Sequence, residues 1–371
     1  MTTLPLTFGS AVVEADFRHI QNRMALDFCK WDSQVGDVAT LFRQLVLIGL
    51  RTWRELKRMA EHLAAELITA EKELLHRPEL YSVLGLPKQL RSAFENSREH
   101  GLTPCAVRTL QFDFHFTTEG WRISEVNSDV PGGYTEASRF TELMCDHYPG
   151  MKPAGNPATE WAEAMFSVVG ARAHVALLSA PGFAEDQQVT AFLAYQLQAR
   201  EVKTLLLHHT SQLNWRQGRA SVLSQSREIA IDAIVRFYQG EWLAKLPSRC
   251  GWKWLFFGGR TPVSNPAPAL LTESKRFPLT WDTLSSKMIT WKILLPGCRD
   301  PREVGWKTGD SWVLKGAFSN TGDDVHIRES MDRETWAKLC RSVEKHPERW
   351  IVQGRFDPVP IPCIQAPFTR V

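Results

Sequence analysis

The chain has few of the features that mark disulfide-rich, zinc-binding or membrane proteins. Its 371 residues include seven cysteines, an odd number, and no two of them form a CxxC pair. No window approaches the run of about 18 apolar residues that a transmembrane helix needs, and the N-terminal MTTLPLTFGS lacks the regions of a signal peptide. A disulfide framework, a cysteine zinc site and a membrane partner are therefore not expected. We expect a cytoplasmic protein with reduced cysteines.

The chain also lacks a large net charge. The formal charge is +3, with 23% charged and 43% hydrophobic residues. This balance is ordinary for folded domains and does not indicate nucleic acid or an anionic membrane as a partner. At about 150 residues per domain, the length predicts two or three units. The sequence leaves the oligomeric state open.

Two common nucleotide-binding motifs are missing as well. The Walker sequence GxxxxGK[ST] does not occur, and no GxGxxG follows the strand expected at residues 173–179. That strand, a helix over 186–199 and a second strand over 202–207 predict a βαβ unit with parallel strands. A third strand is expected at 231–238. A dinucleotide-binding role for this unit therefore has little support.

The N-terminal region is predicted to be helical. A helix is expected from about Val38 to Leu75, ended by Pro78. Its apolar residues step by three and four, as on the buried face of a helix: Leu56, Ala60, Leu63, Leu67, Ala70 and Leu74. The charges between them are expected to form a solvated face: Arg54, Glu55, Lys57, Glu61 and Glu71. Shorter helical pieces are expected over 79–104.

The most informative pattern in the chain is a pair of alternating polar and apolar runs, 112–116 and 121–127, which predict a β-hairpin. Side chains two residues apart on a strand share a face, so Glu125 and Asn127 point the same way, and pairing can bring Asp113 beside them. Two carboxylates and one amide oxygen form a hard-oxygen site that suits Mg²⁺. The other interpretation is an acidic hairpin face exposed to solvent.

A turn, a short helix and a linker follow the hairpin. Residues 129–134 contain a proline and two glycines, which allow backbone to approach a ligand closely. Residues 135–145 are expected to form a short helix. Residues 150–157 are rich in proline and glycine and are expected to link two units.

The final hundred residues contain a second group of candidate ligand-binding residues. Lys315 ends a strand-like run and precedes the loop Gly316–Val325, which is rich in glycine and hydroxyl residues. Backbone N–H groups of such a loop can hold phosphate oxygens, and a neighbouring lysine adds a positive charge. We take Gly316, Ser319 and Gly322 as phosphate-binding candidates. The other interpretation is a hairpin loop with a surface lysine.

These pieces follow one another in an order that resembles glutathionylspermidine synthases and their relatives, the circularly permuted ATP-grasp ligases. The matching motifs, in chain order, are Phe112-Asp113-Phe114, Glu125-Val126-Asn127-Ser128-Asp129, Tyr238-Gln239-Gly240-Glu241-Trp242, Ser274-Lys275, Trp281, Leu294-Leu295-Pro296, Lys315 with its loop, and Ile351-Val352-Gln353. They extend roughly from residue 105 to residue 365, which is most of the chain.

The resemblance implies an α/β (mixed α+β) chain with a circularly permuted ATP-grasp fold, a βαβ pre-ATP-grasp-like domain and an N-terminal helical part. It divides the chain into an N-terminal helical region (1–104), a metal-binding hairpin part (105–157), a pre-ATP-grasp-like domain (158–270) and a nucleotide-binding part (271–371). Family members usually continue well past the Gln353 segment, so the last part is expected to be incomplete at its C-terminus. No amidase domain is expected before the ligase part.

The resemblance also implies two cofactors, ATP and Mg²⁺, and the residues that bind them. These are Asp113, Glu125 and Asn127 for the metal and catalysis, and Lys275, Lys315, Gly316, Ser319, Gly322 and Gln353 for ATP. The lysines would neutralise the α- and β-phosphates, and the glutamine would face the base. The implied reaction joins a small-molecule or peptide carboxylate to an amine acceptor through an acyl phosphate, which the loop after the second lysine would shield from water.

Some positions depart from the family pattern. Relatives often carry an arginine two residues before the metal-binding aspartate, where this chain has Gln111; we include the nearby Arg108 among the catalytic candidates, although it is out of register on the strand. Ser274 replaces the usual Asn, and the glycine-rich loop carries Asp323 and Asp324, which would either bind metal or be solvated. These departures leave two further hypotheses. One is an ATP-binding scaffold of the same fold with little or no turnover, and the other is a structural interaction protein that binds no Mg-ATP.

Overall fold

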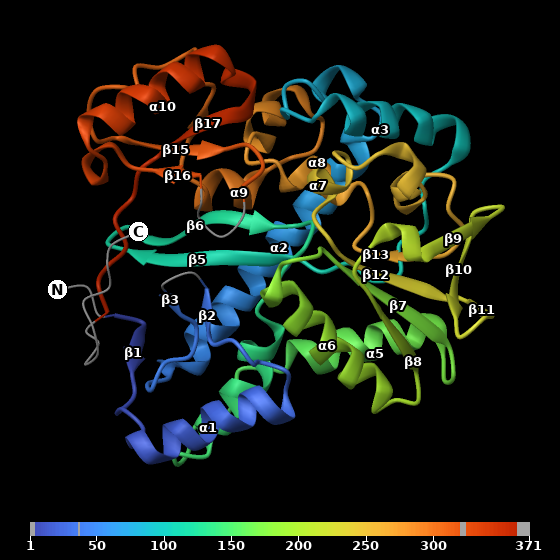
Figure 1. Cartoon of the computed structure of the whole chain (residues 1–371). Coiled ribbons are helices and arrows are strands. Elements are labelled where there is room, and N and C mark those ends of the chain that lie inside the picture. Colours follow the sequence, from blue (N-terminus) through green and yellow to red (C-terminus); the bar gives the residue numbers. More distant parts are fainter. Residues whose placement is uncertain (1–3, 36–37, 320–323, 362–371) are drawn as a thin grey trace.

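A long two-stranded hairpin, β5 (Gln111–Thr117) with β6 (Gly120–Asn127), lies at the centre of the molecule, with other elements on both sides of it (Figure 1). The computed structural model describes residues 4–35, 38–319 and 324–361. The C-terminal sheet and α10 (Arg333–Lys345) lie on one side of the hairpin, and N-terminal elements lie on the other. The predicted hairpin is confirmed.

The N-terminal part combines helices with short strands. Its named elements are β1 (Leu6–Phe8), α1 (Glu14–Asp27), β2 (Gln34–Val35), β3 (Val38–Ala39), β4 (Val46–Ile48), α2 (Leu50–Leu74) and α3 (Lys88–His100). The short helical pieces expected between 79 and 104 are confirmed by α3 and by one 3₁₀ turn before it.

The long helix α2 starts later than the sequence predicts. A helix from Val38 is wrong over its first turns, because β4 pairs antiparallel with β1 and holds this stretch in a sheet. Gly49 then turns the chain into the helix with extended backbone angles, φ −66° and ψ 141°. The predicted end is confirmed, since α2 stops at Leu74, shortly before Pro78. Local helical spacing was overridden by a pairing with residues far away in the sequence.

The buried stripe of α2 contains one charged residue that was predicted to be exposed to solvent. Leu63, Leu67, Ala70 and Leu74 are fully buried, as predicted. Glu71 is also buried, with only 7% of its surface exposed, and does not belong to the solvated face. A buried carboxylate needs a charged or hydrogen-bonding partner.

The hairpin is irregular at the position that carries its carboxylates. Ser124 and Glu125 of β6 lie opposite the single residue Asp113 of β5, between regular pairs on both sides. Such a β-bulge redirects the side chains and leaves backbone groups of the bulged strand outside the ladder. The Ser124 carbonyl therefore becomes available to another part of the chain.

The middle of the chain forms the predicted parallel sheet. Its strand order is β13 (Val263–Ser264), β12 (Ala233–Phe237), β7 (His174–Ser179) and β8 (Lys203–Leu207). All neighbouring strands are parallel, which confirms the βαβ unit with α6 (Ala184–Gln198) as its crossover helix. Helix α6 packs on β7 and β8, and α5 (Pro157–Val169) packs on α6.

Several small elements between these layers were not predicted. They are the antiparallel strands β9 (Leu213–Arg216), β10 (Arg219–Ser224) and β11 (Arg227–Ala230), and the short helices α7 (Gly240–Leu243), α8 (Ala269–Glu273) and α9 (Ile289–Leu294). The short helix expected after the hairpin is confirmed as a π-helical turn, Glu136–Phe140, continued by α4 (Thr141–Cys145).

The C-terminal sheet brings both predicted ligand-binding strands together. Its order is β14 (Cys298–Arg299), β17 (Trp350–Gly354), β15 (Trp312–Gly316) and β16 (Val325–His326). Strand β15 carries Lys315 and strand β17 carries Gln353, as expected. Buried residues of this sheet pack with α10 in a small core of their own: Trp306, Leu314, Trp336, Val343 and Val352.

The described cysteines are all free thiols, and Cys363 lies outside the described residues. Cys298 is buried, and burial raises the pKa of its thiol to about 12. In the ranges that the structure describes, no helix combines the length and apolar character needed to cross a membrane.

A buried ion pair joins the C-terminal sheet to the segment after α8. The Nη2 of Arg276 donates to Asp300 Oδ2 at 2.6 Å, and Nη1 donates to the Trp350 carbonyl at 2.5 Å. Arg276 and Asp300 are 1% and 5% exposed. Burial alone would raise the pKa of Asp300, but hydrogen bonds from Arg302 and Arg276 outweigh it and hold that pKa well below its usual range.

Asp300→Asn is therefore expected to destabilise the fold by about 3–5 kcal/mol at neutral pH, because it leaves a buried guanidinium without its counter-charge. The wild-type advantage should be present above the unfolded-state pKa of about 3.9 and should shrink as the pH falls through the lower folded-state pKa. Urea unfolding of both proteins between pH 7 and pH 2 measures this. A difference in unfolding free energy that stays constant over the whole pH range would contradict it.

Candidate functional site

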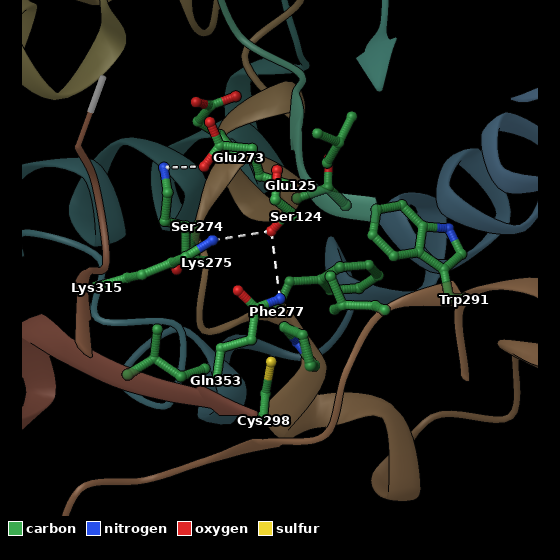
Figure 2. A pocket seen from close by; sticks show the side chains of 15 residues that line it. Ser124, Glu125, Glu273, Ser274, Lys275, Phe277, Trp291, Cys298, Lys315 and Gln353 are labelled. Atoms are coloured by element: carbon green, nitrogen blue, oxygen red, sulfur yellow. Dashed lines mark hydrogen bonds and ion pairs between the residues drawn. The ribbon is translucent and has the colours of Figure 1, made fainter. Parts of the chain in front are cut away.

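A small cavity lies where the hairpin meets α8, α9 and the C-terminal sheet (Figure 2). Its volume is about 30 Å³. Its polar wall contains Glu125, Glu273, Lys275, Lys315 and Gln353, and its apolar wall contains Phe277, Trp291, Leu295 and Ile351. Four residues that the sequence singled out from separate segments thus line one cavity.

The acidic face of the hairpin borders this cavity. The Gln111 Nε2 donates to Asp113 Oδ1 at 3.2 Å. Burial, and then the negative charge of Glu125, raises the pKa of Asp113. A pair of neighbouring carboxylates attracts a cation, and Asn127 ends the same strand with an amide oxygen. Asp113 and Glu125 are therefore neighbours, as pairing across the hairpin predicts, and their role as metal ligands stays a prediction.

Lys275 links this acidic face to the loop after β15. Its Nζ lies 3.2 Å from Glu125 Oε2 and donates to the Ser319 carbonyl at 2.6 Å. Its backbone N–H donates to the Ala317 carbonyl at 2.9 Å. The lysine side chain is 8% exposed, so this contact is shielded from water. One ammonium group therefore holds both the Glu125 carboxylate and the start of the predicted phosphate loop.

The Ser124 carbonyl, freed by the bulge, receives two donors from the C-terminal sheet. Lys315 Nζ donates to it at 3.1 Å and Gln353 Nε2 at 3.3 Å, and Figure 2 shows both side chains pointing to this oxygen. Lys315 is 6% exposed, and burial lowers the pKa of its ammonium group. A desolvated lysine with one weak partner is well suited to bind an anion.

Arg108 lies beneath the end of β6, outside the cavity wall. Its guanidinium donates to Glu71 Oε2 at 2.7 Å, to Ser128 Oγ at 2.6 Å and to the Ser128 carbonyl. Glu71 of α2 is thus the buried partner of this arginine. The role of Arg108 in catalysis stays a prediction, and its guanidinium is engaged with the backbone that follows the metal-side strand.

Buried hydrogen bonds also hold the residues that follow the hairpin. Asp129 is buried and accepts two hydrogen bonds from the Arg236 guanidinium and one from the Gly240 N–H, the last at 2.8 Å. Asn265 donates to the carbonyls of Ser128 and Asp129, each at 3.1 Å. The turn predicted to approach a ligand is therefore anchored at its start.

The predicted phosphate loop is described only in part. Gly316 and Ser319 are buried, and the Gly316 N–H donates to the Asp324 carbonyl at 2.9 Å. A Cβ at Gly316 would lie 2.9 Å from the Asp324 side chain, so the close return of the chain requires glycine here. Gly322 and Asp323 lie outside the described residues.

Three contributors to the site were not predicted. Glu71 follows Leu67 by four positions on the buried stripe of α2, and this spacing is a signal that could have identified it. Glu273 is buried immediately before Ser274-Lys275, and nothing in its local sequence indicates burial. The Ser124 carbonyl depends on a bulge, which alternation of residues does not reveal.

The donor set determines which metal would fit. Within the described ranges, no group of three or more His, Cys, Asp or Glu side chains could hold a metal ion. Asp113 and Glu125 provide two carboxylates and Asn127 an amide oxygen, an all-oxygen set without the His or Cys ligands typical of Zn²⁺ and one that suits Mg²⁺, which is completed by water and substrate phosphates. The residues present therefore fit Mg²⁺ held jointly with a nucleotide.

Comparison with known proteins shows the family and the fold of this chain. A family described as glutathionylspermidine synthase preATP-grasp matches residues 23–361. A similar solved structure is a glutathione synthetase-like effector from Globodera pallida in its apo form, at a TM-score of 0.55 and 14% identity. The match covers 82% of this chain and 73% of that chain, and at this identity it shows the fold alone. No curated protein matches the chain.

Proposed function

Because the chain belongs to the glutathionylspermidine synthase preATP-grasp family, we propose that it is an ATP-dependent ligase that joins a carboxylate to an amine. Its mixed α/β architecture is of the ATP-grasp type, as the sequence predicts. The family indicates an amide-forming ligase, and the roles of individual residues below are part of our proposal.

One observation carries the proposal. Lys275 and Lys315, from segments well over a hundred residues after the hairpin, meet the hairpin at Glu125 and at the neighbouring Ser124 carbonyl. Buried lysines beside a carboxylate pair form a site with charges of both signs in a low-dielectric environment. Phosphate oxygens can replace the protein acceptors of the lysines, and the released carboxylate can then bind a metal.

Different residues of the site have different proposed roles. Asp113, Glu125 and Asn127 would hold Mg²⁺, which when bound neutralises phosphate charge. Lys275 and Lys315 would bind the nucleotide phosphates, since each loses only one or two carbonyl or carboxylate contacts in exchange. The rest of catalysis would consist of positioning ATP, the acid and the amine, and of stabilising the charge of the phosphoryl group during its transfer.

The proposed reaction has two steps without a covalent enzyme intermediate. A substrate carboxylate oxygen attacks the γ-phosphorus of ATP, and ADP leaves with the bridging oxygen. The amine nitrogen then attacks the carbonyl carbon of the acyl phosphate, loses a proton, and inorganic phosphate leaves. An acyl phosphate reacts with water, so the buried surroundings of Lys315 and Ser319 favour amide formation by limiting access of solvent.

The cavity must widen before a nucleotide binds. Its volume of about 30 Å³ is near that of one water molecule, whereas small-molecule pockets measure roughly 300–1,000 Å³. The contacts that close it are the two hydrogen bonds to the Ser124 carbonyl and the apolar packing of Trp291, Leu295 and Ile351. We propose that the C-terminal sheet moves away from the hairpin when ATP enters.

A second candidate function is an ATP-binding scaffold with little turnover. Gln111 supports it, because this neutral side chain bonds to Asp113 where relatives often have an arginine. Arg108 does not replace that arginine in the described conformation, since its guanidinium is paired with Glu71. Both functions require Mg-ATP binding, and they differ in whether an acid and an amine stimulate ATP cleavage.

Phosphate release separates the two functions. The purified chain is incubated with Mg-ATP and with panels of carboxylic acids and amines, added singly and together. The ligase predicts phosphate release that requires both an acid and an amine, with an amide product detected by mass spectrometry. ATP binding without any stimulation by the panels would favour the scaffold instead.

A further inference from the structure

Glu273 is a buried carboxylate beneath the end of the metal-side strand. It is the last residue of α8 and only 7% of its surface is exposed. Its Oε2 accepts the backbone N–H groups of Ser128 at 2.6 Å and of Asp129 at 2.8 Å. These two residues directly follow Asn127, the last residue of β6.

The segment that carries Glu273 contacts β6 a second time. Lys275, two residues later, reaches the Glu125 carboxylate, 3.2 Å from Oε2. Thr272, one residue earlier, shares a hydrogen bond with Ser128 Oγ at 2.9 Å. Successive residues of one short segment therefore hold the backbone after β6 and the side chain of a proposed metal ligand.

The contacts of Glu273 with the backbone after β6 and of Lys275 with Glu125 together determine the distance between β6 and the Lys275 ammonium. The backbone after Asn127 is held by two short hydrogen bonds, from the Ser128 and Asp129 N–H groups to Glu273 Oε2. If this backbone shifts, the oxygens of Glu125 and Asn127 move relative to the Lys275 ammonium. Displacements of about 1 Å in such a constellation are enough to reduce binding or turnover strongly.

We propose that Glu273 is a positioning residue of the Mg-ATP site, which sets the spacing between the metal ligands on β6 and the phosphate-binding Lys275. This inference rests on the proposed function. Glu273 acts through the Ser128 and Asp129 amides and through its own segment. Its role is to keep the proposed metal ligands on β6 at a fixed distance from the phosphate-binding Lys275.

Three substitutions separate the hydrogen-bond acceptor from the charge. Glu273→Gln keeps an oxygen that can accept both N–H groups. Glu273→Asp keeps the charge but is one methylene too short, and Glu273→Ala removes the acceptor. Asp332→Ala is the matched control, because the Asp332 carboxylate also accepts two successive backbone N–H groups, of Glu334 and Thr335, each at 2.9 Å, at the remote start of α10.

The decisive measurement is the effect of Mg²⁺ on ATP affinity, taken as the ratio of the ATP dissociation constants in EDTA and in Mg²⁺. We expect Glu273→Ala to reduce this ratio roughly tenfold, a typical size for coupling between two ligands, with Glu273→Gln close to wild type and Asp332→Ala unchanged. If Glu273→Ala does not fold, Glu273→Asp is expected to give the same loss. A lower melting temperature with an unchanged ratio would show that Glu273 is only structural and would overturn the proposal.

Hydrogen exchange distinguishes failure of this inference from failure of the proposed function. Wild-type protein without Mg-dependent ATP binding would refute the function. In that case, the positioning role is judged by the amides of residues 125–129 in Glu273→Asp. Faster exchange that extends from Ser128 and Asp129 to Glu125 and Asn127 is expected, and an effect confined to Ser128 and Asp129 would overturn the inference.

Discussion

Replacing Glu125 with glutamine is expected to lower ligase turnover by roughly 100- to 1,000-fold, because several kcal/mol of charge stabilisation by the metal are lost. Glutamine has almost the same shape as glutamate and keeps one oxygen, but it lacks the charge that Mg²⁺ requires. The side chain is 23% exposed, and among the described residues its ion-pair partner is Lys275. Because the Lys275 ammonium is buried and keeps only its bond to the Ser319 carbonyl, loss of this pair should lower the unfolding free energy by about 1–3 kcal/mol.

Phosphate release at increasing Mg²⁺ concentration measures this effect, with the unfolding midpoint followed in parallel. Glu119→Gln is the matched control, because Glu119 lies at the turn of the same hairpin, its side chain is 76% exposed, and it pairs with Arg122. This control should keep wild-type turnover. Wild-type turnover and Mg²⁺ dependence in Glu125→Gln would remove the basis for the metal assignment.

Lys315→Met is expected to raise the ATP dissociation constant roughly 10- to 100-fold, the range for losing one charged hydrogen bond of about 1.5–3 kcal/mol. Methionine keeps most of the volume of the buried side chain, so the packing around β15 is retained. The ammonium group donates a hydrogen bond to the Ser124 carbonyl, and removal of this contact leaves an acceptor that water or Gln353 can satisfy.

Calorimetric titration of Mg-ATP into wild type and Lys315→Met tests this expectation. Lys292→Met is a suitable control, because Lys292 is an exposed lysine of the neighbouring helix α9 and pairs with Asp282 at 3.0 Å. Its dissociation constant should equal that of wild type. A melting temperature that falls in Lys315→Met while ATP affinity stays unchanged would make the lysine structural.

The parts of the fold that the sequence predicts correctly depend on local patterns. Alternation over residues 112–116 and 121–127 locates the hairpin, and short apolar runs locate β7, β8 and β12. The strand before Lys315 and the strand containing Gln353 are found in the same way. In each case the period of the side chains within one strand carries the information.

The parts that the sequence misses depend on partners far along the chain. Residues from Val38 to Gly49 have helical spacing, but Val38–Ala39 pairs with β2 and Val46–Ile48 pairs with β1. Glu71 has the composition of a solvated face, yet its partner Arg108 lies 37 positions away. Glu273 is buried against amides 144 and 145 positions earlier. The spacing of Glu71 from Leu67 indicates that Glu71 is buried, but a single sequence identifies neither its partner nor the partners of Glu273.

For the candidate site, the sequence likewise predicts the residues but not the contacts between them. The types and order of Asp113, Glu125, Lys275 and Lys315 are present in the sequence, and their resemblance to a family connects them. Their meeting at one cavity, the bulge that exposes the Ser124 carbonyl and the contact between Lys275 and Glu125 come from the three-dimensional structure.

The central claim is that the hairpin carboxylates and the two lysines form one Mg-ATP site. Titration of ATP into the wild-type chain, once with Mg²⁺ and once with EDTA, tests this most directly. We predict saturable binding with one site per chain, at least tenfold tighter with Mg²⁺, as expected for a metal that couples protein carboxylates to phosphates. Absence of ATP binding under both conditions, or equal affinity with and without the metal, would contradict the account.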